Sequence, residues 1–89
     1  MELWIRSQDK ETLRLANMLD IYDGSVDEEK CFVIEESGVD LGSYKTKERA
    51  LEVLDEIQQL IEDLQYMSYA IPNDKFTSYR PNVYNMPKE

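Results

Sequence analysis

The residues best suited to binding chemistry lie near the C-terminal end of the chain, where aromatic rings alternate with polar side chains. Rings that stack on a base and a guanidinium that pairs with phosphate are the groups that nucleotide recognition requires. The candidate ligand-binding residues of this segment are Phe76, Tyr79, Arg80, Asn82 and Tyr84. The alternative is that the rings only pack on the body of the protein, because anchoring a tail needs the same residue types.

A second place for an anion is the start of the predicted helix, where Lys45 and Arg49 flank the first turn. Backbone N–H groups at a helix N-terminus add to the attraction, so Arg49 joins the candidate ligand-binding residues. Arg6 is a further cation of this kind. The neighbouring Glu48 and the negative net charge of the chain oppose an anion here.

A third candidate surface is the acidic side of the same helix, which carries Glu52, Asp55, Glu56 and Asp63. These carboxylates could imitate nucleic acid and occupy a basic groove on an enzyme. Glu48, Glu52 and Glu56 recur every four residues, where like charges repel, and this cost is consistent with a role in binding. The alternative is an ordinary solvated helix face.

Catalytic and metal chemistry has little support in the composition, because the chain has no histidine and one cysteine, Cys31. It lacks the commonest general base, any Ser-His or Cys-His nucleophile, the usual zinc ligands and an internal disulfide. The acidic segment 23–29 does not match the spacing of an EF-hand loop. Cys31 is expected to be a small buried hydrophobe. We therefore expect a binding protein that is not an enzyme and holds no metal or cofactor.

The net charge is strongly negative, with 19 acidic and 10 basic residues giving −9. A body of this charge repels nucleic acid and anionic membranes. No basic leader followed by an apolar run opens the sequence, and no apolar stretch approaches the roughly 20 residues that span a bilayer. We expect a cytoplasmic protein with no nucleic-acid or membrane partner.

Short apolar patterns predict an antiparallel sheet in the first half of the chain. The predicted strands are 3–6, 13–22, 31–34 and 39–44, of which 31–34 is expected to be central. A helix beginning at Asp9 is the alternative for 13–19, and the alternation that continues to Tyr22 favours the strand. Turns are expected at 23–25 and 37–38.

The clearest local pattern predicts a helix from Lys47 to about Met67. Thr46 is a good N-cap, and the helix dipole favours Glu48 in the first turn. Apolar residues recur at three- and four-residue spacing: Ala50, Val53, Leu54, Ile57, Leu60, Ile61, Leu64 and Met67. Pro72 ends this region, and the residues from Lys75 to Glu89 are predicted to form an extended segment that can include one edge strand.

The fold class predicted from these elements is α+β: a three- to four-stranded antiparallel meander, one long amphipathic helix and an extended C-terminal tail. Residues 1–71 are expected to form the core, with the aromatic tail 72–89 packed on the same domain. One helix covers one face of a sheet, and the other face carries large apolar groups such as Trp4 and Phe32. The tail or a second subunit must cover that face, and we expect a homodimer.

Three stretches, LWIRSQD at 3–9, LGSYKTKERA at 41–50 and VYNMP at 83–87, together resemble small hypothetical proteins of phages and prophages of low-GC Gram-positive bacteria. In architecture, the predicted fold is similar to the Thoeris anti-defence sponge family, which sequesters cyclic ADP-ribose signalling molecules at subunit interfaces. This resemblance implies a counter-defence protein in the bacterial host that binds a cyclic nucleotide-type small molecule. The acidic charge is instead similar to that of acidic anti-CRISPR proteins, which implies an inhibitor that binds a host defence protein.

Overall fold

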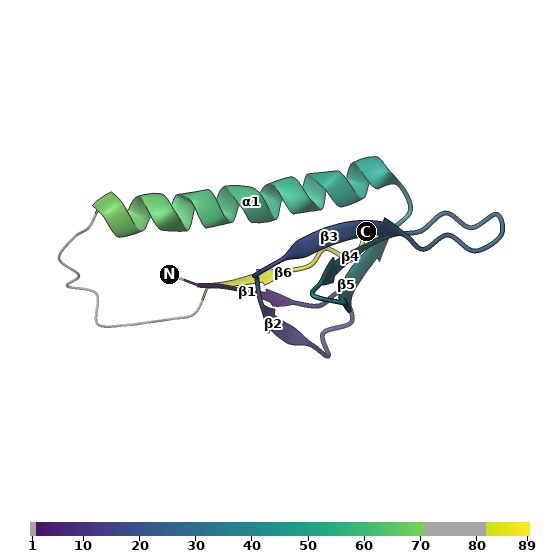
Figure 1. Cartoon of the computed structure of the whole chain (residues 1–89), viewed down its shortest axis with the longest axis horizontal. Coiled ribbons are helices and arrows are strands. Elements are labelled where there is room, and N and C mark those ends of the chain that lie inside the picture. The colour runs from purple at the N-terminus through teal and green to yellow at the C-terminus, as the bar shows by residue number, and fades with distance from the viewer. Residues whose placement is uncertain (1, 71–81) are drawn as a thin grey trace.

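A computed structural model of the chain describes residues 2–70 and 82–89. The described residues form the helix α1 (Lys47–Ala70) and the strands β1 (Leu3–Arg6), β2 (Leu13–Leu15), β3 (Leu19–Asp23), β4 (Phe32–Glu36), β5 (Val39–Tyr44) and β6 (Asn82–Asn85). The predicted α+β class is confirmed, because β3, β4 and β5 form a three-stranded antiparallel meander that α1 follows (Figure 1).

The structure adds a second three-stranded sheet, with strand order β2-β1-β6. We call this the N-terminal sheet, and we call β3-β4-β5 the meander sheet. In the N-terminal sheet β1 pairs with β2 antiparallel and with β6 parallel, so Trp4 lies opposite both Leu15 and Val83. Figure 1 shows β1 and β6 side by side although they come from opposite ends of the chain. Parallel strands need a long connection, and here almost the whole chain provides it.

The segment 13–22 forms strands, as predicted, and not the alternative helix, but it forms two strands, so the prediction of one continuous strand was wrong. The chain leaves the N-terminal sheet after β2 and enters the meander sheet at β3. Across the break, the Ala16 N–H donates to the Leu3 carbonyl at 2.8 Å, and the Met18 carbonyl accepts from the Ser37 N–H at 3.2 Å. Backbone groups at the break are therefore hydrogen-bonded to residues of both sheets and their turns. Alternation within the segment cannot reveal this change of partner.

The meander sheet agrees closely with the predicted strands. β4 is central, and Ser37 and Gly38 form the turn to β5 with φ angles of 47° and 90°. Positive φ at both turn residues is the geometry that matches the twist of a two-residue hairpin. Cys31 lies one residue before β4 and is only half-buried, which corrects the prediction that it is a small buried hydrophobe.

Helix α1 begins where the sequence predicts and ends three residues beyond Met67. The Thr46 hydroxyl accepts a hydrogen bond from the Arg49 N–H at 3.1 Å, which confirms Thr46 as the N-cap. Leu60, predicted to lie on the buried stripe, is exposed. Among residues 2–70 and 82–89, no helix has the length and apolar character needed to cross a membrane.

A single hydrophobic core lies between α1 and the inner faces of both sheets. Its buried members are Leu3, Ile5, Ile34, Leu41, Tyr44, Ala50, Val53, Ile57 and Met86. Figure 1 shows α1 running along one side of the strands. Because the inner faces of both sheets pack on the same helix, the opposite face of the N-terminal sheet points away from α1.

The C-terminal residues 82–89 are tied to the body of the protein at several points. Met86 is 2% exposed, and its N–H donates to the Arg6 carbonyl at 3.1 Å. The Tyr44 hydroxyl donates to the Pro87 carbonyl at 2.8 Å, and the Gln8 amide donates to the same carbonyl at 3.1 Å. The extended tail with one edge strand is therefore present over 82–89, while the predicted boundary between 71 and 72 lies outside the described residues.

Candidate functional site

Two of the predicted ligand-binding residues, Arg49 and Tyr84, meet at one carboxylate on α1. The Tyr84 hydroxyl donates to Glu56 Oε1 at 2.7 Å, and Arg49 Nη1 lies 3.9 Å from Glu56 Oε2. Arg49 Nη1 also donates to Glu52 Oε1 at 3.2 Å, and Arg49 Nε donates to the main-chain oxygen of Glu89 at 3.0 Å. The structure therefore joins residues that the sequence assigned to two different sites.

The chemistry of this cluster is that of an anchor more than of an anion site. Burial and the hydrogen bond to Glu56 raise the pKa of Tyr84 well above its ordinary value of 10.0, so its hydroxyl stays a donor. Burial also raises the pKa of Tyr44 to about 12. Arg49 already faces Glu52 and Glu56, so a phosphate at this position would compete with two carboxylates for the same guanidinium.

The other predicted ligand-binding residues are not brought together in the part of the chain that the structure describes. Asn82 is exposed at the start of the edge strand β6. Phe76, Tyr79 and Arg80 lie outside the described residues. Stacking by these rings and phosphate binding by Arg80 therefore stay predictions.

The acidic helix face is open to solvent along its length. The side chains of Glu52 and Glu56 are 66% and 53% exposed, and Asp55 and Asp63 are exposed as well. Asp63 accepts a hydrogen bond from Gln59 at 3.0 Å on the same face. From residue 50 to the end of α1 the sequence contains five acidic residues and no basic residue. The four residues predicted to bind a partner thus share one solvent-facing surface.

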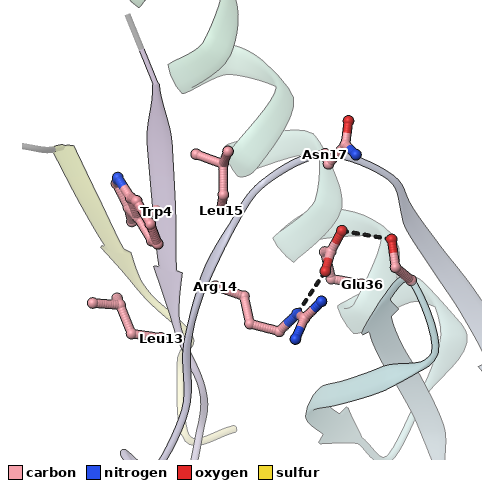
Figure 2. A pocket seen from close by; sticks show the side chains of 7 residues that line it. Trp4, Leu13, Arg14, Leu15, Asn17 and Glu36 are labelled. Atoms are coloured by element: carbon pink, nitrogen blue, oxygen red, sulfur yellow. Dashed lines mark hydrogen bonds and ion pairs between the residues drawn. The ribbon is translucent and has the colours of Figure 1, made fainter.

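A site that the sequence reading missed lies beside β2, at an edge of the N-terminal sheet. A hollow of about 370 Å³ lies there, and Figure 2 shows the side chains around it. It is lined by Trp4, Leu13, Arg14, Leu15, Asn17, Glu36 and Ser37. Arg14 Nε donates to Glu36 Oε1 at 2.6 Å, and the Ser37 hydroxyl donates to Glu36 Oε2 at 2.7 Å.

Glu36 is the most buried charged side chain of this hollow, with 4% of the side chain exposed. Hydrogen bonds from Ser37 and then from Arg14 hold the pKa of its carboxyl below the ordinary value of 4.5, so it stays ionised at neutral pH. The pair neutralises Arg14 and ties the N-terminal sheet to the turn of the meander sheet. The only hint in the sequence was an arginine between two leucines of a short strand, and its partner is 22 residues away.

The remaining candidates have local partners. Arg6 Nε donates to the Lys10 carbonyl at 2.8 Å, whereas Lys45 is exposed. In the acidic loop, Asp23 accepts from the Ser25 N–H at 2.9 Å. In residues 2–70 and 82–89, no group of three or more His, Cys, Asp or Glu side chains is placed to hold a metal ion.

Comparison with known proteins finds no match for this chain among protein-family models, curated proteins or solved structures. The resemblances to small phage proteins and to anti-defence families therefore stay predictions.

Proposed function

We propose that this chain is a phage- or prophage-encoded binding protein that docks the acidic face of α1 into a basic surface of a host defence protein. We call this face, made of Glu52, Asp55, Glu56 and Asp63, the acidic helix face. The observation that carries the proposal is its exposure on a 24-residue helix whose cations all lie in the first turn. A basic groove that ordinarily holds nucleic acid is the partner of matching chemistry.

The rigidity of this surface supports the proposal. Val53 is fully buried and Ile57 is 1% exposed, so the core holds the helix axis while the carboxylates face solvent. Binding then costs little backbone ordering, because the charges are already arranged along one helix. Clustered negative charge also accelerates encounter with a basic partner, and salt weakens that effect.

The test is co-purification from host extract with a triple variant, Glu52→Gln, Asp55→Asn and Asp63→Asn. Glu56 is left intact because it holds Tyr84. We expect the partner to bind roughly threefold to a hundredfold more weakly, since three exposed charge pairs together contribute about 0.6–3 kcal/mol. Excess double-stranded DNA should release the partner from the wild type, because DNA competes for the same basic groove.

The matched control removes three charges elsewhere, with Asp27→Asn, Glu28→Gln and Glu29→Gln in the exposed loop before β4. It should bind like the wild type. If both triple variants lost the same affinity for the partner, net charge and not the acidic helix face would explain the binding. If DNA did not disturb the complex, the partner's surface would not be a nucleic-acid groove. Either result contradicts the proposal.

A second proposed function is sequestration of a cyclic nucleotide-type immune signal by Phe76, Tyr79 and Arg80. It is favoured by the exposed Asn82, which lies two residues after Arg80 at the start of the anchored strand β6. Calorimetric titration with a panel of cyclic nucleotides tests it. We expect one of them to bind the wild type and to lose at least tenfold in affinity with Arg80→Ala. Titrations in which no cyclic nucleotide depends on Arg80 would end this proposal.

A further inference from the structure

The outer face of the N-terminal sheet is an apolar surface that α1 does not cover. Trp4, Leu15 and Val83 are direct cross-strand neighbours and so project from the same face of three adjacent strands. Leu13 lies on that face too, opposite Arg6. We call Trp4, Leu13, Leu15 and Val83 the outer apolar row.

Leu13 and Val83 of the outer apolar row are exposed and Trp4 and Leu15 are half-buried, in contrast to the buried inner face of the same strands. Leu13 and Val83 are 47% and 44% exposed, whereas Leu3 and Ile5 on the inner face are 5% and 0% exposed. The hollow shown in Figure 2 continues this surface, since Trp4, Leu13 and Leu15 line it. Apolar side chains grouped in this way on one sheet face are typical of an interface.

The charge of this sheet is opposite to that of the rest of the molecule. The strands β1, β2 and β6 contain Arg6 and Arg14 and no acidic residue, in a chain of net charge −9. Arg14 lies opposite Ile5, on the other face of the sheet, and pairs with Glu36. Arg6 is therefore the charged strand residue of the outer face. Two copies of an acidic protein repel each other, and here they can approach without placing strand carboxylates against each other.

From this pattern we infer that the outer apolar row is the interface through which two copies of this chain pair face to face. Glu2 is exposed and directly precedes β1, and continuing the alternation of the strand by one residue places Glu2 and Arg6 on either side of Trp4 on the outer face. When two such faces pack with their β1 strands antiparallel, Arg6 of one copy lies over Glu2 of the other. The surface is therefore self-complementary in both apolar character and charge, as a two-fold interface must be.

Other occupants fit this face less well. A basic partner would meet Arg6 and only one carboxylate, that of Glu2, and nucleic acid or an anionic membrane would be repelled by the acidic body. A second copy also adds buried apolar area to a domain whose own core is small because of its size. Because the face points away from α1, pairing leaves the acidic helix face of each copy exposed, and the inference does not depend on the proposed function.

The test is sedimentation equilibrium of the full chain at tens of micromolar, with Val83→Glu and Leu13→Glu as interface variants. The matched control is Leu51→Glu, which adds the same charge at a leucine of similar exposure, 43%, on α1. We expect dimers for the wild type and for Leu51→Glu. We expect the dissociation constant of the dimer to rise at least tenfold in each interface variant, because a buried carboxylate would face the partner's apolar row.

Trp4 is the only tryptophan in the sequence, so its fluorescence reports directly on this face. Its emission should shift to longer wavelength when the wild type is diluted, and it should be long-wavelength and independent of concentration in Val83→Glu. Circular dichroism confirms that each variant is folded. A monomeric wild type would overturn the inference. This includes a monomer with short-wavelength Trp4 emission, because such a monomer would cover the face with its own chain. Dimers that persist in both interface variants would overturn it as well.

Discussion

At the scale of single residues, two arginine side chains, Arg14 and Arg49, connect separate segments of this protein. Arg14 joins β2 to the end of β4, and Arg49 joins the first turns of α1 to the last residue of the chain. Both guanidiniums face carboxylates that are close enough to compete with an incoming anion. Binding of a basic partner by the acidic helix face is therefore better supported than binding of an anion at Arg49.

The Glu36 carboxylate gives the molecule a defined sensitivity to acid. Because the pKa of Glu36 in the folded protein lies below its ordinary value of 4.5, its contribution to stability is complete above about pH 4.5. That contribution is lost as the pH falls through the lowered pKa of the folded state. We expect Glu36→Gln to melt at a lower temperature than the wild type at pH 7 and to show a flatter decline below pH 4.5.

The matched control for Glu36 is Glu35→Gln, the neighbouring position on β4, which makes no side-chain hydrogen bond within the described residues. Thermal melts of both variants between pH 3 and pH 7 make the comparison. If the two variants showed the same pH dependence, the pair with Arg14 would not stabilise the fold.

At the scale of elements, α1 is the rigid support of the acidic helix face, and its start is set by one hydrogen bond. Thr46 caps the helix through its hydroxyl and the Arg49 N–H. Thr46→Ala removes the acceptor, and we expect the free energy of unfolding to fall by about 0.5–2 kcal/mol in urea titrations. Thr46→Ser keeps the hydroxyl and should stay close to the wild type. Equal losses in both variants would attribute the effect to the threonine methyl group instead of the cap.

The two sheets differ in how their strands find partners. The strands of the meander sheet follow one another along the chain. Residues 24–31 connect β3 to β4, and the turn Ser37-Gly38, which has the φ angles of a tight hairpin, connects β4 to β5. The N-terminal sheet instead depends on β6, which is 76 residues from the end of β1 when counted from Arg6 to Asn82. A sheet closed by such a distant strand forms only once the rest of the fold has brought the two ends of the chain together.

At the scale of the whole molecule, the C-terminal residues lock the fold by closing the N-terminal sheet over the core. Met86 is 2% exposed and is in the same core as Ile5 and Tyr44. We expect Met86→Ala to lower the free energy of unfolding by about 2–5 kcal/mol, the usual cost of a large-to-small change in a core. This is a large part of the stability of a small domain.

Urea denaturation at a fixed protein concentration measures this effect, because a change of oligomeric state would also alter apparent stability. Lys88→Ala, at an exposed position two residues away, is the control and should change little. A Met86→Ala protein as stable as the wild type would show that the tail is dispensable for the fold.

The sequence by itself determined the elements whose evidence is local. The N-cap at Thr46, the three- and four-residue spacing that follows it and the turn at Ser37-Gly38 all act over one or two turns of chain. Helix α1, the meander sheet and the exposure of the acidic helix face could therefore be predicted from neighbouring residues.

Only the tertiary structure decided which distant segments meet. The break of 13–22 into two strands, the parallel pairing of β1 with β6 and the pair of Arg14 with Glu36 join residues whose separation no periodic pattern records. The same holds for Tyr84, whose ring suggested a ligand but whose hydroxyl binds Glu56. The physical reason is that alternation specifies which face a residue occupies, whereas packing of the whole chain selects the partner on that face.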